Sequence, residues 1–303
     1  MENKYSQPTP YRISTITSTG CVGTTIDLDV LYNTLEALCV DDLESSGIVY
    51  VEYGKKKSET IFKGFSKKYS VNRRKVKPTK RFDNQVTIVY RTPEKNCLNI
   101  KTFRNGNLQV TGIKSITQGY LIVDTMIDIL KNVYNTKDKT VIENVDELKN
   151  VNFKIRLINT DYKVGFTIKR ENLHKILKND YDAVCNYEPC IYPGVKMQYF
   201  YNKTNSNKDG ICKCDQKCHN MKGCEGNGDG DCKKITIAIF QSGCVIITGS
   251  QTKDQIDECY EYINNILYKN AAKIEKVNMV SIDDKPIVAK KIILIPKSKV
   301  TFI

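Results

Sequence analysis

Two stretches of the chain share one pattern of apolar and polar positions. Each begins with Phe, has Asn or Ser and then Gly at the third and fourth positions, and continues with alternating aliphatic residues up to a Thr-Gly pair: FRNGNLQVTG from Phe103 and FQSGCVIITG from Phe240. Alternation with a period of two predicts strands with two different faces, and an NG or SG centre favours a hairpin turn. The pattern therefore predicts the same strand–turn–strand unit twice.

The match between the two hairpins extends in both directions at a constant shift of 137 positions. Before the turn Leu98 falls on Ile235, and well beyond the Thr-Gly pair Gln118 falls on Gln255. Agreement over this length without a gap argues against chance. We interpret the chain as an internal duplication.

Other elements follow the same order in both halves. Amphipathic helical patterns follow the hairpins, and an opening strand with a second helix precedes each of them. The predicted opening strands are 11–20 and 152–161, the helices after them are 26–38 and 168–177, and the helices after the hairpins are 115–133 and 252–270.

These elements predict an α+β fold built from tandem pseudo-symmetric repeats. Two antiparallel sheets would join edge to edge and carry their helices on one face. The other face would then lack a covering layer, and an uncovered sheet face indicates a binding partner.

The net charge of +13 is concentrated in one segment. Between Gly54 and Arg81 there are twelve Lys or Arg residues and one acid, Glu59, so this stretch carries +11 and the rest of the chain is near neutral. Such a segment can meet nucleic acid, bind an import receptor or be a solvated loop.

Five of the twelve cysteines fall in one Gly- and Asp-rich run, with a histidine beside them. Four thiolate or imidazole ligands suffice for one structural zinc, although the spacing matches no standard CxxC pair. Disulfides and free thiols are the alternatives. The zinc would be held by four of Cys212, Cys214, Cys218, His219, Cys224 and Cys232.

Few features indicate catalysis, membrane insertion or export. His174 and His219 are the only histidines, no nucleophile and base pair up, and no nucleotide-binding fingerprint is present. We therefore expect no enzyme and no organic cofactor. Without an apolar run of membrane length or a signal-like N-terminus, we expect the protein on the cytosolic or nuclear side.

Three motifs in the second half resemble the TATA-box-binding protein family. They are NFKI from Asn152, YEPCIYPG from Tyr187 and IFQSGCVIITG from Ile239. The resemblance covers about 11–35, 82–133, 151–200 and 234–270, and the long insertions are similar to those of divergent members from large DNA viruses. It implies a saddle-like antiparallel sheet with helices on the convex face and a concave face that binds and bends the DNA minor groove.

The resemblance also implies which residues touch DNA. That family inserts two aromatic rings per repeat as wedges between base pairs, and these fall on Phe103 with Phe82 and on Phe240 with Tyr192. A larger set would line the groove or contact phosphates: Thr17, Lys101, Gln109, Thr111, Lys114, Asn159, Ile246 and Thr248.

Several positions depart from the family pattern. The asparagines at the centre of the groove fall on Thr15 and Leu157, although Asn159 shares the strand face with Leu157. Lys101 and Gln109 replace apolar groove residues, so the first repeat becomes polar while the second keeps its apolar floor. Asp161 would also lie on this face, and several basic phosphate contacts fall on Asn107, Cys244 and Gln251.

The resemblance and the pattern together give a domain plan and a function. We expect an N-terminal tail 1–10, a first repeat 11–146 with a basic insertion 54–81, a second repeat 147–272 with a Cys-rich insertion 202–234, and an extension 273–303. The implied role is a general transcription initiation factor that binds A·T-rich promoter DNA and recruits general transcription factors and RNA polymerase. The alternative is a saddle-fold interaction scaffold that has lost specific TATA readout.

Overall fold

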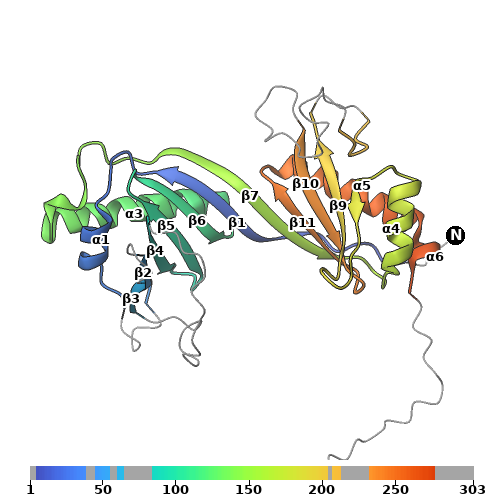
Figure 1. The fold of residues 1–303 in the computed structure, drawn as a ribbon, viewed down its shortest axis with the longest axis horizontal. Helices are drawn as coiled ribbons and strands as arrows, with labels where there is room; N and C mark the ends of the chain where they lie inside the picture. Colours follow the sequence, from blue (N-terminus) through green and yellow to red (C-terminus); the bar gives the residue numbers. More distant parts are fainter. Residues whose placement is uncertain are drawn as a thin grey trace, which may run out of the picture.

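The structure, a computed structural model, describes residues 5–38, 45–54, 60–64, 84–203, 207–212 and 232–276. Within them, one antiparallel sheet of 11 strands runs through the molecule in the order β3-β2-β4-β5-β6-β1-β7-β11-β10-β9-β8. Two long strands, β1 and β7, connect two lobes, as Figure 1 shows. The predicted edge-to-edge joining of two sheets is therefore the pairing of β1 with β7.

The same series of elements occurs in each lobe. The first lobe contains β1 (Arg12–Cys21), α1 (Leu28–Thr34), β2 (Gly47–Gly54), β3 (Thr60–Gly64), β4 (Gln85–Arg91), β5 (Cys97–Phe103), β6 (Asn107–Ile113), α3 (Ile116–Thr136) and the short 3-10 helix η2 (Lys139–Val141). The second contains β7 (Val151–Lys163), α4 (Arg170–Asn179), β8 (Cys185–Asn186), β9 (Val195–Tyr201), β10 (Lys233–Ile239), β11 (Cys244–Ser250), α5 (Lys253–Lys269) and α6 (Ala271–Ile274).

Strand alternation decides which face meets the helices. In β10, Ile235, Ile237 and Ile239 are fully buried, while Thr236 and Phe240 on the other side stay partly exposed. In β5, Leu98 and Ile100 are buried in the same way. The prediction that the aliphatic face packs under the helices is confirmed. The opposite face, which carries Thr17, Asn99, Thr111, Asn159 and Thr248, is called the open face below.

Matching turn contacts confirm the duplication in three dimensions. Gly106 and Gly243 occupy the two hairpin turns with φ of +78° and +77°. The carbonyl of Gly106 accepts a hydrogen bond from Val22 N at 3.0 Å, and that of Gly243 accepts one from Val164 N at 2.9 Å. Each hairpin is thus fixed to the loop that follows its opening strand.

A capping box explains why Gln118 and Gln255 match in sequence. Ser115 and Thr252 cap α3 and α5 by accepting hydrogen bonds from the backbone N–H of these glutamines. Each glutamine side chain accepts in return from a preceding backbone N–H, Lys114 N at 2.8 Å for Gln118 and Gln251 N at 2.7 Å for Gln255. The cap hydroxyl thus satisfies one N–H group of the first helical turn, and the glutamine side chain satisfies the backbone N–H of the residue before the cap.

The first short helix ends earlier than its sequence pattern predicts. We expected a helix over 26–38, but α1 stops at Thr34 and Leu35 is extended with ψ of 139°. Lys63 on β3 donates from Nζ to the carbonyls of Tyr32, Asn33 and Leu35 at 2.7, 2.9 and 3.2 Å. A cation on the last carbonyls of a helix favours termination at this point.

The role of Lys63 also changes the interpretation of the basic segment. Residues 60–64 of the 54–81 insertion form an edge strand paired with β2, so this part of it is sheet. Burial, and then the neighbouring Lys137, lower the pKa of Lys63. Most of the remaining segment lies outside the described residues.

The N-terminal arm, residues 5–11, crosses to the second lobe. The Tyr5 ring lies 5.0 Å from that of Phe166, and Thr9 N donates to Lys163 O at 2.9 Å. The hydroxyl of Tyr268 donates to Ser6 O at 2.6 Å. The start of the chain therefore packs on the opposite repeat. Among the described helices, none is both long and apolar enough to cross a membrane.

Candidate nucleic-acid interface

Strand register arranges the centre of the open face in two equivalent rows of side chains. Backbone pairing aligns one residue from each strand, and paired residues point to the same face. The first row is Asn99, Thr111, Thr17 and Leu157, and the second is Thr236, Thr248, Asn159 and Thr15. Thr248 Oγ1 donates to Asn159 Oδ1, which joins two neighbouring strands through their side chains.

A second pair of rows lies farther from the centre, and here the two repeats differ. In the first repeat the row is Thr87, Lys101, Gln109, Thr19 and Lys154. In the second repeat it is Lys196, Ala238, Ile246, Asp161 and Arg12. The predicted contrast is present in the middle of the two rows, where Lys101 and Gln109 of the first repeat correspond to Ala238 and Ile246 of the second. The ends of the second row are charged, with Lys196 at one end and Asp161 and Arg12 at the other.

A β-bulge at Arg156 changes which residues of β7 reach this face. The partner of Thr17 is Leu157, but the partner of Ser18 is Ile155, so Arg156 is an extra residue. Beyond the bulge Lys154 therefore joins the open face, whereas Phe153 packs on Tyr120 of α3 with ring centroids 4.0 Å apart. Arg156 itself donates from Nε to Thr19 Oγ1 at 2.8 Å.

Two aromatic rings lie together at one end of the open face. The centroids of Tyr192 and Phe240 are 5.6 Å apart, and both rings are half-buried. A Cβ on Gly194 would lie only 3.0 Å from Tyr192 Cε1 and 3.2 Å from Phe240 Cε1, so the glycine lets both rings approach the chain. Burial, and then the nearby Cys244 thiol, raise the pKa of Tyr192, which keeps its phenol neutral.

Basic side chains support this aromatic pair. Lys196 Nζ lies 4.0 Å from the centroid of the Tyr192 ring. Arg170 donates to Pro193 O and to Gln241 Oε1, the latter at 3.2 Å. Because Pro193 and Gln241 neighbour the two rings in sequence, Arg170 ties together the two loops that carry them.

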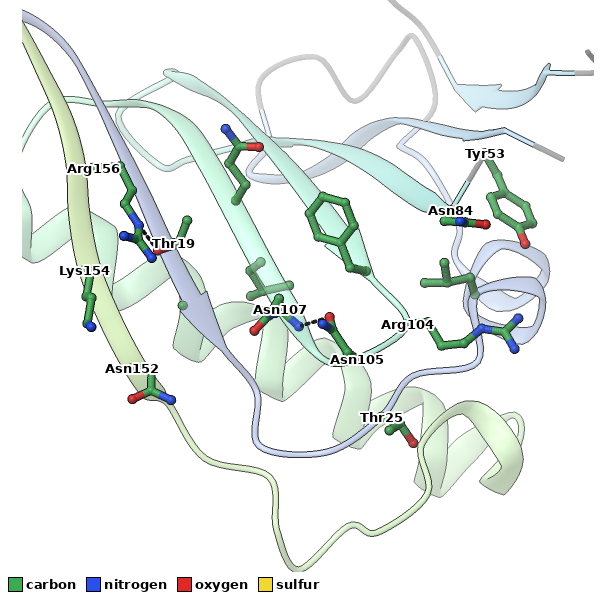
Figure 2. Close-up of a pocket in the computed structure, with 15 residues that line it drawn as sticks. Thr19, Thr25, Tyr53, Asn84, Arg104, Asn105, Asn107, Asn152, Lys154 and Arg156 are labelled. Atoms are coloured by element: carbon green, nitrogen blue, oxygen red, sulfur yellow. Dashed lines mark hydrogen bonds between the residues drawn. The ribbon is translucent and has the colours of Figure 1, made fainter. Parts of the chain in front are cut away.

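In the first repeat, Phe103 lies beside a large hollow, shown in Figure 2. The hollow has a volume of about 1160 Å³, and none of its lining residues is acidic. Lys154 and Arg156 of β7 line one side and Arg104 lines the opposite side. The expected partner ring, Phe82, lies outside the described residues, so its role stays a prediction.

Two acidic residues of the described strands lie on the open face. Glu52 of β2 pairs with Thr87 and accepts a hydrogen bond from the Tyr50 hydroxyl at 3.0 Å. Asp161, which we expected to disfavour phosphates, accepts a hydrogen bond from Arg12 Nε at 2.8 Å. Arg12 is largely exposed, and Asp161 is largely covered. The ion pair offsets the charge that would oppose a polyanion.

The structure also locates the predicted phosphate contacts. The Lys114 ammonium donates to the carbonyl of Ser14, so part of its hydrogen-bonding capacity is already used. Arg156, Lys154 and Arg12 were missed from the sequence because strand alternation alone cannot locate the bulge or pair β1 with β7. That any of these residues touches DNA stays a proposal.

The cysteine cluster is described only at its two ends. Cys212 is half-buried, and Cys232 is buried and accepts from Asn202 Nδ2 at 3.7 Å. The other candidate zinc ligands, Cys214, Cys218, His219 and Cys224, lie outside the described residues. Zinc binding therefore stays a proposal.

Comparison with known proteins gives three findings. The family described as "Transcription factor TFIID (or TATA-binding protein, TBP)" matches residues 152–270. A protein of Acanthamoeba polyphaga mimivirus named "TATA-box-binding protein-like" is 31% identical over 278 residues, covering 87% of this chain and 66% of the viral protein. This chain therefore spans about two thirds of that relative. A solved structure of Methanococcus jannaschii TBP matches with 18% identity and a TM-score of 0.43, over 86% of this chain and 99% of that one.

Proposed function

The chain belongs to the TATA-box-binding protein family as a divergent member, and from this premise we propose that its open face binds and bends the minor groove of promoter DNA. Bound there, it would nucleate assembly of general transcription factors and RNA polymerase. Its site of action would be the nucleus or a viral factory. The family consists of transcription factors, and we propose no catalytic role.

The observation that supports the proposal is the position of the aromatic rings that we expect to act as wedges. Tyr192 and Phe240 pair at one end of the open face, and the equivalent hairpin places Phe103 at the other end. A neutral ring can enter between two base pairs, which costs a few kcal/mol per step and is offset when the bent duplex contacts more protein surface. The rows between the wedges supply that surface.

Charge on the same face supports a polyanionic partner. The hollow beside Phe103 is lined by three cations without an acid, and Asp161 is paired with Arg12. Phosphate contacts of this kind supply much of the affinity of proteins for DNA and make it salt-dependent.

The interaction scaffold remains a second candidate because of the centre of the face. Thr15 and Leu157 stand where the family has paired asparagines, and Asn159 Oδ1 already accepts from Thr248. The centre of the face therefore offers fewer free polar groups to base edges than paired asparagines would. The scaffold would bind transcription proteins without specific TATA readout.

The test is DNA bending measured by fluorescence energy transfer across a duplex labelled at both ends. Phe103→Ala and Phe240→Ala should each lower the affinity by about tenfold and reduce the bend, because each removes one wedge. Tyr120→Ala is the matched control, since it removes an exposed ring from the helical side of the sheet. An unchanged bend in both Phe variants would exclude wedge insertion, and absence of DNA binding by the unaltered protein would favour the scaffold.

A further inference from the structure

The outer rows of the open face differ in chemistry at equivalent positions. Lys101 and Gln109 are directly paired neighbours in the first repeat, and Ala238 and Ile246 are paired in the same way in the second. Gln109 and Ile246 lie two residues along their strands from the central threonines, Thr111 and Thr248. The two halves therefore offer different surfaces to the same groove.

Gln109 has the chemistry to meet base edges. Its side chain is half-buried on the open face, and within the described part of the chain no residue hydrogen-bonds to its amide. An amide offers one acceptor oxygen and two donor hydrogens. Thr19 and Lys101, its neighbours across the row, add a hydroxyl and an ammonium.

The minor groove distinguishes base pairs by one group. A·T pairs present only acceptors there, whereas G·C pairs add the exocyclic N2 amino donor of guanine. An apolar floor built from Ala238 and Ile246 leaves this donor without a partner, and a buried unpaired donor costs about tenfold in affinity. The amide oxygen of Gln109 can accept from it.

We infer that the two repeats read different half-sites: the second repeat requires A·T pairs, whereas the first selects a G·C pair opposite Gln109. This inference rests on the proposed binding of the minor groove. A site with unlike halves also fixes the direction in which the saddle lies on the DNA. The protein would then mark the direction of transcription by base contacts within its own site.

The length of the outer row in the first repeat agrees with this assignment. Strands lie about 4.8 Å apart, so the four strands from Thr87 to Thr19 span about 14 Å. At 3.4 Å per base pair this is about four base pairs. The cations around this row, Lys154 and Arg156, bring phosphate contacts to the same half.

Selection of bound duplexes from a random pool, at one stated salt concentration, tests the inference. The unaltered protein should retain sites with one A·T-only half and one half that contains a G·C pair. The variant Lys101→Ala/Gln109→Ile copies the second repeat onto the first and should select A·T pairs in both halves. The reciprocal variant Ala238→Lys/Ile246→Gln should select G·C pairs in both.

Inosine substitution identifies the atom involved. Inosine lacks the N2 amino group, so replacing the selected guanine should weaken binding of the unaltered protein by about tenfold. The same replacement should strengthen binding of the Lys101→Ala/Gln109→Ile variant, because its apolar floor leaves the N2 donor of guanine without a partner. If the unaltered protein bound and bent sites with A·T pairs in both halves, this inference alone would be overturned. Failure to retain any duplex would overturn both this inference and the proposed function. Lys101 and Gln109 are partly exposed, so their double variant should fold, whereas Ala238 is buried and thermal unfolding has to check that the reciprocal variant folds.

Discussion

At the scale of single residues, close contacts and backbone conformation both require glycine in the two hairpin turns. A Cβ on Gly243 would lie 2.4 Å from the carbonyl oxygen of Phe166, and one on Gly106 would lie 2.2 Å from that of Thr24. Both glycines also have positive φ, which L side chains disfavour. The turn and the neighbouring loop therefore accept only glycine without rearrangement.

Gly243→Ala and Gly106→Ala should each lower the free energy of unfolding by at least about 2 kcal/mol, because strain and a backbone clash act together. Urea denaturation followed by circular dichroism measures this. Ser242→Ala, at the exposed position before Gly243, is the control and should change it by less than about 0.5 kcal/mol. Equal stability of all three variants would show that the loops can move aside.

At the scale of elements, the sequence was informative where a local pattern determines structure. Hairpin strands and long helices follow from apolar periodicity, and α3, α4 and α5 lie where the pattern predicts them. The end of α1 could not be predicted because it depends on Lys63, which lies some thirty residues later in sequence. The bulge at Arg156 is equally invisible, since it exists only relative to a partner strand.

The Cys-rich insertion is attached to the sheet between β9 and β10. β9 and β10 stay paired as far as Tyr201 and Lys233, so the insertion leaves and returns at a closed end of a hairpin. Residues 207–212 pack back on β9, where Phe200 N donates to Gly210 O at 2.9 Å. A deletion should therefore spare them and remove only 213–231.

If one zinc is held by four of the six candidate side chains, elemental analysis should find about one zinc per chain, and the deletion of 213–231 should abolish it. The saddle should keep its melting temperature because the β9–β10 pairing remains. Thiol titration of the unaltered protein distinguishes zinc binding from disulfides and free thiols. Disulfides would leave few reactive thiols although no zinc is bound. Equal zinc contents in the two proteins would place the metal elsewhere.

At the scale of the whole molecule, the described residues join the lobes through a strand pair and through the N-terminal arm. β1 pairs with β7 along the middle of the sheet, and the N-terminal arm packs on the second lobe. The arm adds ring contacts and hydrogen bonds from tyrosines of that lobe, including Tyr260 OH to Thr9 O at 3.0 Å. Sequence periodicity predicted only a tail here, because an irregular segment has no repeating pattern.

Deleting residues 1–10 should lower the melting temperature by about 4–8 °C, which corresponds to a loss of about 2 kcal/mol from an aromatic contact and several hydrogen bonds. Differential scanning calorimetry measures this. Deleting only residues 1–4, which precede the described contacts, is the matched control and should leave the melting temperature unchanged. A similar melting temperature for both truncated proteins would mean that the arm contributes nothing to stability.

The position of the arm also bears on how the protein is made. Tyr5 bonds to Glu275 and Ser6 to Tyr268, so the arm meets partners that the ribosome adds more than 260 residues later. At about 5–20 residues per second this interval lasts tens of seconds. During it the first repeat can fold, but β1 has no β7 to pair with and its outer edge is open to other strands. Synthesis of the second repeat closes that edge, so a nascent chain stalled between the repeats would be the form most prone to aggregation.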